Sequence, residues 1–112
     1  MTSVVIIEDH ALVREGLRLI LQDEPGIRIA GEAAGVADAF ALVERTEPDV
    51  ALVDLTLGGA DGIPLLRGLG VRYPGTRTVA LTMHDDGETV RQAFLAGAAG
   101  YVVKGAASGE LI

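Results

Sequence analysis

The chain has 112 residues, of which 49% are hydrophobic and 22% charged, and its formal net charge is −7. This length suits one domain with its own core, and the hydrophobic fraction excludes a disordered chain. The absence of cysteine excludes a disulfide scaffold, thiolate zinc sites and a cysteine nucleophile. The acidic balance argues against direct nucleic-acid binding, which needs basic groups to neutralise phosphates. No apolar stretch reaches membrane-spanning length and the first residues lack a basic signal region, so we expect a cytoplasmic domain without a membrane partner.

Short apolar runs alternate with helical patterns along the chain. The predicted elements, in order, are strand Ser3–Ile7, helix Ala11–Gln22, strand Ile27–Ala33, helix Val36–Glu44, strand Val50–Val53, helix Ile63–Val71, strand Thr78–Thr82, helix Thr89–Ala96 and strand Gly100–Val103. Strand starts lie roughly two dozen residues apart, the length of a βαβ repeat. This alternation predicts an α/β fold whose parallel sheet has helices on both faces.

The last nine residues predict a loop that opens one more helix, with Ser108 as its N-cap. Because the chain stops at Ile112, we expect this fifth helix to be truncated or missing. Apolar sheet surface would then be exposed, and self-association into a homodimer becomes an expectation.

Two of the apolar runs end at carboxylates. Glu8 and Asp9 follow the first strand, and Asp54 follows the third. Ligands of open α/β sheets bind beyond the carboxyl ends of the strands, so three acids converge there if these strands are neighbours. Carboxylates crowded that closely repel one another unless a cation or protons intervene. The residues therefore predict a divalent metal beside a reactive Asp54.

These residues belong to an ordered set that resembles the receiver domain of two-component response regulators across the whole chain. The set comprises Glu8-Asp9, Asp54, Asp61-Gly62, Thr82 at the end of the fourth strand, Lys104 at the end of the fifth, and Tyr101 three residues before that lysine. Residues 8–17 and 81–86 are similar to receivers that precede a LuxR/NarL-type helix-turn-helix. The resemblance implies a flavodoxin-like, doubly wound five-stranded parallel sheet of order 2-1-3-4-5. It also implies that residues 1–112 are a receiver domain of a longer protein whose C-terminal domain binds DNA.

The resemblance assigns the chemistry to the acid cluster. Asp54 would accept a phosphoryl group from a sensor histidine kinase, since a carboxylate is a competent nucleophile. Asp9, Asp54 and the backbone carbonyl of Thr56 would bind Mg²⁺ directly, with Glu8 acting through water. Magnesium favours such sites with few carboxylates, several waters and phosphate oxygens.

The other residues of the set imply a conformational switch. Lys104 would pair with the acids and then with the phosphoryl oxygens, and Thr82 would donate its hydroxyl to one of them. Tyr101 would turn inward or outward with that change, although plain packing is an equal alternative. The implied output is a phosphorylation-activated shift in conformation that controls transcription, with at most weak self-dephosphorylation as enzyme activity.

Two other functions remain open. A Mg²⁺-dependent phosphohydrolase with an Asp nucleophile would need a second Asp two residues later, where Thr56 stands. A receiver-like scaffold that is never phosphorylated is the other alternative. The chain departs from the usual receiver pattern at Gly58, Met83 and Gly105, and Glu8 stands where Asp is more frequent. None of these departures removes a chemical group that the phosphorylation mechanism needs, but their effect on phosphorylation rates stays open.

Other polar residues near the strand ends have simpler interpretations. His10 and His84 suggest metal binding, but isolated histidines on loops are usually solvated, which we expect here. Glu8 and Asp9 are also expected to cap the first helix and to place charge at its positive end. Asp61-Gly62 predicts a turn and a helix start.

Overall fold

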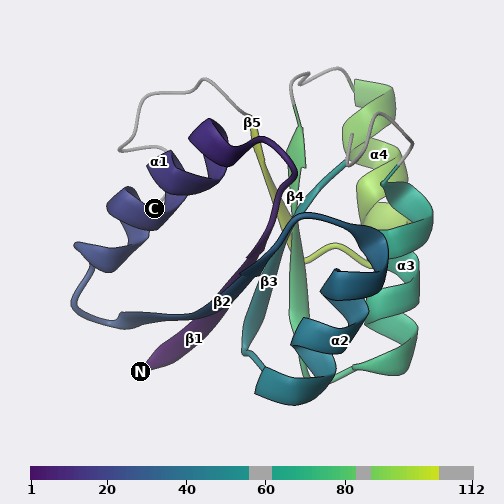
Figure 1. Ribbon diagram of the computed structural model, residues 1–112. Coiled ribbons are helices and arrows are strands. Elements are labelled where there is room, and N and C mark those ends of the chain that lie inside the picture. Colours follow the sequence, from purple (N-terminus) through teal and green to yellow (C-terminus); the bar gives the residue numbers. More distant parts are fainter. Residues whose placement is uncertain (56–61, 83–86, 104–112) are drawn as a thin grey trace.

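The computed structural model describes residues 1–55, 62–82 and 87–103 (Figure 1). Its elements are β1 (Thr2–Ile7), α1 (Ala11–Gln22), β2 (Ile27–Ala33), α2 (Val36–Thr46), β3 (Val50–Asp54), α3 (Ile63–Arg72), β4 (Arg77–Thr82), α4 (Gly87–Leu95) and β5 (Gly100–Val103). The predicted elements are all present, with bounds that differ by at most two residues. The expected fifth helix and its Ser108 cap lie outside the described residues.

The strands form one parallel sheet of order β2-β1-β3-β4-β5, which confirms the expected flavodoxin-like topology. The chain runs from β1 outward to β2 and then returns past β1 to start β3. The strand order therefore reverses between β1 and β3, and the carboxyl ends of these two strands flank the switch point. Ile7 is paired with Val53, so the residues that follow them leave the sheet side by side.

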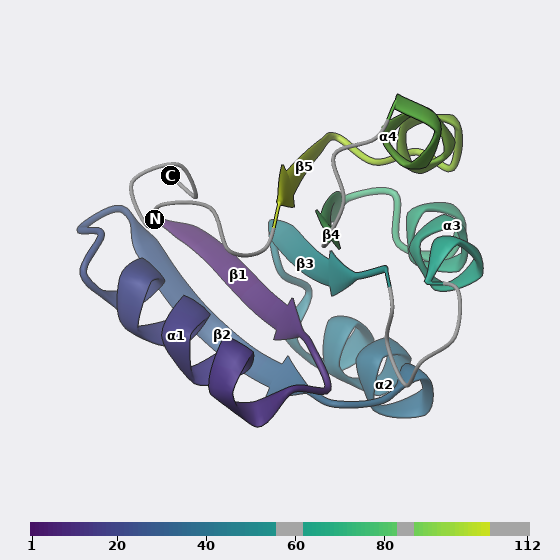
Figure 2. The same cartoon turned by 90° about the horizontal axis from the view of Figure 1, so that it is seen from above.

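Helices cover both faces of the sheet, and alternate residues of β1 point to opposite faces. Val5 and Ile7 join the core beneath α2, α3 and α4, whereas Val4 and Ile6 join the core beneath α1. Figures 1 and 2 show this division, with α1 on one side of the sheet and the other three labelled helices on the opposite side. A strand buried on both faces needs an uninterrupted apolar run, which is why Val4–Ile7 shows no polar alternation.

A polar clamp, formed by Ser3 and Asp49, joins the starts of β1 and β3 at the end of the strands opposite to the acids. The carboxylate Oδ2 of Asp49 accepts hydrogen bonds from the backbone N–H of Ser3, at 2.9 Å, and from the Ser3 hydroxyl, at 3.2 Å. The backbone N–H of Asp49 in turn donates to the Ser3 Oγ, at 3.0 Å. These donors stabilise the ionised carboxylate and hold the pKa of Asp49 below its ordinary value of 3.8, the backbone N–H of Ser3 being the main cause.

Within the part of the chain that the structure describes, no helix combines the length and the apolar character needed to cross a membrane.

Candidate functional site

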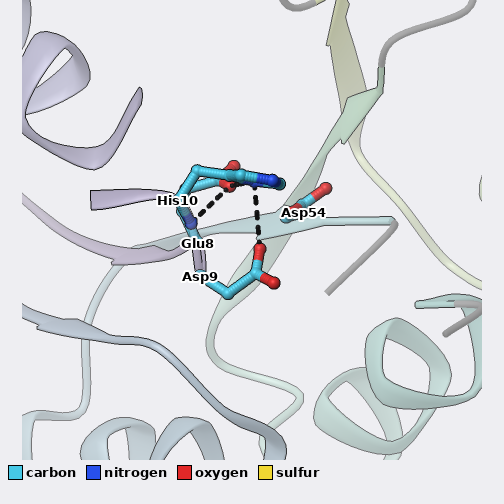
Figure 3. A group of neighbouring side chains, drawn as sticks. All are labelled: Glu8, Asp9, His10 and Asp54. Carbon is cyan, nitrogen blue, oxygen red and sulfur yellow. Dashed lines mark hydrogen bonds and ion pairs between the residues drawn. The ribbon is translucent and has the colours of Figure 1, made fainter. Parts of the chain in front are cut away.

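Three carboxylates and one imidazole meet where β1 and β3 end. One oxygen each of Glu8, Asp9 and Asp54, together with a ring nitrogen of His10, lie within 4.8 Å of one another. Figure 3 shows Glu8, Asp9 and His10 on the connection that leaves β1, facing Asp54 at the end of β3. The convergence of acids that the sequence predicted is therefore present, and it follows from the pairing of Ile7 with Val53.

Burial gives this cluster its chemical character. Glu8 and Asp54 are fully buried, whereas the side chain of Asp9 is 26% exposed. Buried carboxylates so close together are costly unless cationic or hydrogen-bonding groups compensate their charge. Carboxylate oxygens are also the protein ligands that hard divalent cations such as Mg²⁺ prefer. The donor set thus fits the predicted metal.

His10 belongs to the cluster, which the sequence interpretation did not foresee. Its Nδ1 lies 2.8 Å from Glu8 Oε1 and 3.2 Å from Asp9 Oδ1, and its backbone N–H donates to Glu8 Oε1 at 3.1 Å. The side chain is 62% exposed, so it is largely solvated as expected, but its ring nitrogen faces the acids. The available signal was the three-residue connection between Ile7 and Ala11, which is too short to carry any of its side chains far from the strand end.

The expectation that Glu8 and Asp9 cap α1 is wrong. The N-cap is His10, which makes no side-chain cap hydrogen bond, and the first turn of α1 contains no acid. The physical reason is the same short connection, which places His10 at the cap position and leaves both carboxylates beside the strand ends.

Arg14 of α1 holds the connection between β1 and α1 in place. Its Nη1 donates to the backbone carbonyl of Glu8 at 2.8 Å, and its Nε lies 3.2 Å from Glu32 Oε1 on β2. The backbone N–H of Arg14 also donates to the carbonyl of His10, at 2.9 Å. The first turn of α1 therefore fixes the backbone on either side of Asp9.

The other predicted residues lie on neighbouring strands or outside the described ranges. Thr82 is buried at the end of β4, one residue beyond Leu81, the residue paired with Asp54. Tyr101 of β5 is 42% exposed and packs edge-to-face on Phe94 of α4, with 6.1 Å between the ring centroids. Several predicted residues lie outside the described ranges, namely Thr56, Gly58, Asp61, Met83, His84, Lys104 and Gly105.

Gly62 packs directly against the strand end that carries Asp54. Its N–H donates to the carbonyl of Leu55 at 2.5 Å, and it is the N-cap of α3, as the predicted helix start required. A Cβ at this position would lie 2.6 Å from both the Asp54 carbonyl oxygen and the Leu55 Cα. Only glycine allows this approach, so the start of α3 holds the end of β3 in place.

Residues 4–112 match the family model of the response regulator receiver domain. The chain belongs to this family, in agreement with its sheet order and with the acids at the switch point.

Its relatives place it among receivers of the LuxR/NarL type. The chain is 43% identical, over 93% of its length and 48% of the relative's, to the DNA-binding transcriptional activator DevR/DosR of Mycobacterium tuberculosis. It is 36% identical to the response regulator UvrY of Escherichia coli, over 100% of its own length and 51% of the relative's. The chain thus spans about half the length of these curated relatives.

Solved structures give the same result. The receiver domain of the putative response regulator NarL from Mycobacterium tuberculosis superposes with a TM-score of 0.89 at 34% identity, covering 98% of this chain and 89% of that one. A LuxR-family two-component response regulator from Aurantimonas sp. superposes with a TM-score of 0.92 at 36% identity, covering 99% and 79%.

Proposed function

We propose that this domain is a phosphorylation-activated switch in which Asp54 accepts a phosphoryl group from the phosphohistidine of a sensor histidine kinase. The observation that carries this proposal is the meeting of Glu8, Asp9 and Asp54 within 4.8 Å at the switch point of the sheet. Membership of the receiver family supports it.

A carboxylate oxygen of Asp54 attacks the phosphorus, and the P–N bond to the kinase histidine breaks. The electron pair of that bond passes to the imidazole nitrogen, and an acyl phosphate forms on Asp54. Asp9, Asp54 and the backbone carbonyl of Thr56 would hold Mg²⁺, and Glu8 would act through water. When bound, the ion supplies positive charge that offsets the crowding of carboxylate and phosphoryl oxygens.

The switch follows from the charge that is added. A phosphoryl group brings about −1.5 to −2 charges and three strong acceptor oxygens. Thr82 donates its hydroxyl to one of these oxygens and Lys104 pairs with another, so the conformation that allows both contacts gains population. Tyr101, now partly exposed against Phe94, turns with Thr82.

The output is control of transcription by a C-terminal helix-turn-helix domain in a longer protein. The name of one relative, a DNA-binding transcriptional activator about twice as long as this chain, supports this assignment. With a net charge of −7, the receiver itself contributes no DNA contacts and acts through its conformation or through a homodimer. The proposed partners are therefore the kinase, the DNA-binding domain and a second copy. Self-dephosphorylation is at most weak in this scheme, in which the phosphoryl group acts as a signal.

The test is phosphorylation by acetyl phosphate with Mg²⁺, followed by intact mass measurement. The wild-type domain should gain one phosphate adduct, and Asp54→Asn should gain none. Asp49→Asn is the matched control, because this residue precedes β3 at the end of the strand opposite to Asp54, and the amide oxygen of asparagine can still accept both hydrogen bonds from Ser3. This variant should keep the adduct. An adduct that persists in Asp54→Asn would refute the assignment of the acceptor. The absence of any adduct on the wild type would favour a scaffold, and steady release of phosphate from a metabolite would favour a phosphohydrolase.

A further inference from the structure

We propose that His10 is a nitrogen ligand of the metal site, and that it raises the affinity of this receiver for Zn²⁺-like transition ions relative to Mg²⁺. This inference rests on the proposed function of the acid cluster and adds a residue and a selectivity to it. The observation that carries it is the position of the His10 ring nitrogen among the oxygens of Glu8, Asp9 and Asp54.

The distances match those between neighbouring ligands of a single ion. Nitrogen and oxygen ligands lie about 2.0–2.2 Å from Zn²⁺, so two ligands at right angles or tetrahedral angles are roughly 2.8–3.6 Å apart. His10 Nδ1 is 2.8 Å from Glu8 Oε1 and 3.2 Å from Asp9 Oδ1. The complete set lies within 4.8 Å, so it must contract to about 3.6 Å for a tetrahedral ion, or to about 4.4 Å where two ligands are opposite each other.

The backbone fixes His10 in this position, and its ring nitrogen contacts both neighbouring acids. The carbonyl of His10 accepts from the Arg14 N–H at 2.9 Å, and its own N–H donates to Glu8 Oε1. At the N-cap the side chain makes no hydrogen bond to the helix. Because the side chain is 62% exposed, a hydrated ion can reach it from the solvent.

The chemistry of the donor set sets the selectivity. Carboxylate oxygens suit Mg²⁺, whereas imidazole suits Zn²⁺, Cu²⁺ and Ni²⁺. A site of oxygens alone already binds later transition ions more tightly, and one imidazole widens that difference. Zn²⁺ binding should therefore depend on His10, whereas Mg²⁺ binding should depend on the three acids.

The experiment compares binding of Zn²⁺ alone and of Mg²⁺ alone to the unphosphorylated domain by calorimetry. The key variant is His10→Asn, because asparagine can still donate a hydrogen bond to Glu8 from near the position of Nδ1 but is a poor ligand for Zn²⁺. We expect Zn²⁺ affinity to fall by at least the roughly 10-fold that follows loss of a group supporting a metal ligand, with Mg²⁺ affinity unchanged. Zn²⁺, but not Mg²⁺, should also shift the ring carbon and proton NMR signals of His10. The matched control is His84→Asn, which removes the chain's only other histidine and should leave both affinities unchanged.

Three results would overturn the inference. The first is an unchanged ratio of Zn²⁺ to Mg²⁺ affinity in His10→Asn. The second is an equal fall for both ions, which would make His10 only a hydrogen-bonding support for Glu8. The third is loss of Zn²⁺ binding in His84→Asn alone. Each of them leaves the proposed function intact, because the phosphate adduct on Asp54 is measured separately.

Discussion

Replacing Gly62 by alanine tests how closely the start of α3 holds the strand end that carries Asp54. The new Cβ would lie 2.6 Å from the Asp54 carbonyl oxygen and from the Leu55 Cα, and 2.8 Å from the Leu55 carbonyl carbon. Ordinary contact begins at 3.4 Å. All three atoms belong to the backbone, so no side-chain rotation relieves the clash, and α3 and the end of β3 must separate.

Two opposing terms set the size of the effect. Overpacking of a tightly packed site costs about 1–3 kcal/mol. Alanine also restricts the unfolded chain, which returns about 0.4–1 kcal/mol. The free energy of unfolding should therefore fall by roughly 1–2 kcal/mol, which corresponds to a decrease in Tm of about 4–8 °C for a domain near this size.

Thermal unfolding followed by circular dichroism measures this change, with Gly70→Ala as the matched control. Gly70 lies in the same helix and has no atom within 4 Å of its ideal Cβ, so alanine there should raise the Tm through better helix propensity. Displacement of Asp54 should also slow the reaction of Gly62→Ala with acetyl phosphate. A Gly62→Ala variant as stable as the wild type would show that the contact between α3 and β3 is looser than described.

Three further variants probe the rest of the fold. Wild type and Asp49→Asn should differ most in their free energy of unfolding near neutral pH, and the difference should shrink as the pH falls below 3.8. The reason is that the lowered pKa of Asp49 contributes stability only while its carboxylate is ionised. A difference that stays constant in urea titrations across this pH range would contradict the clamp. Leu66→Ala should lower the free energy of unfolding by about 2–5 kcal/mol, since this side chain is fully buried in the core beneath α3; a smaller loss in urea denaturation would indicate a loosely packed core. Gly16→Ala should stabilise the domain by about 0.5–1 kcal/mol, because no atom lies within 4 Å of its ideal Cβ in α1; a fall in Tm would refute this.

The sequence predicted the fold closely because each local signal agreed with the topology. The run Val4–Ile7 has no polar alternation, and the structure buries it on both faces of the sheet. Pro48 and Gly75 interrupt the apolar patterns between the end of a helix and the start of the next strand. Boundaries moved by a residue or two because tertiary pairing extends a strand beyond its apolar run, as it does for Asp54 at the end of β3.

The site was predicted less completely, for a reason that differs between residues. Convergence of Glu8, Asp9 and Asp54 follows from strand order, so topology was sufficient to predict it. The contacts of His10 and Arg14 depend on side-chain direction over the first turn of α1, which residue spacing alone does not determine. The close approach of Gly62 depends on the path of the chain between β3 and α3, which composition does not reveal.

The Ser3–Asp49 clamp has a consequence at the far end of the sheet. In a parallel pair, a slip of one residue would turn every side chain to the opposite face. By joining Ser3, the second residue of β1, to Asp49, the residue before β3, the clamp supports an alignment that the strand ladder carries along its length to Ile7 and Val53. The spacing of the reactive carboxylates is thus set in part by two uncharged hydrogen-bond donors of a serine that lies several residues away from them.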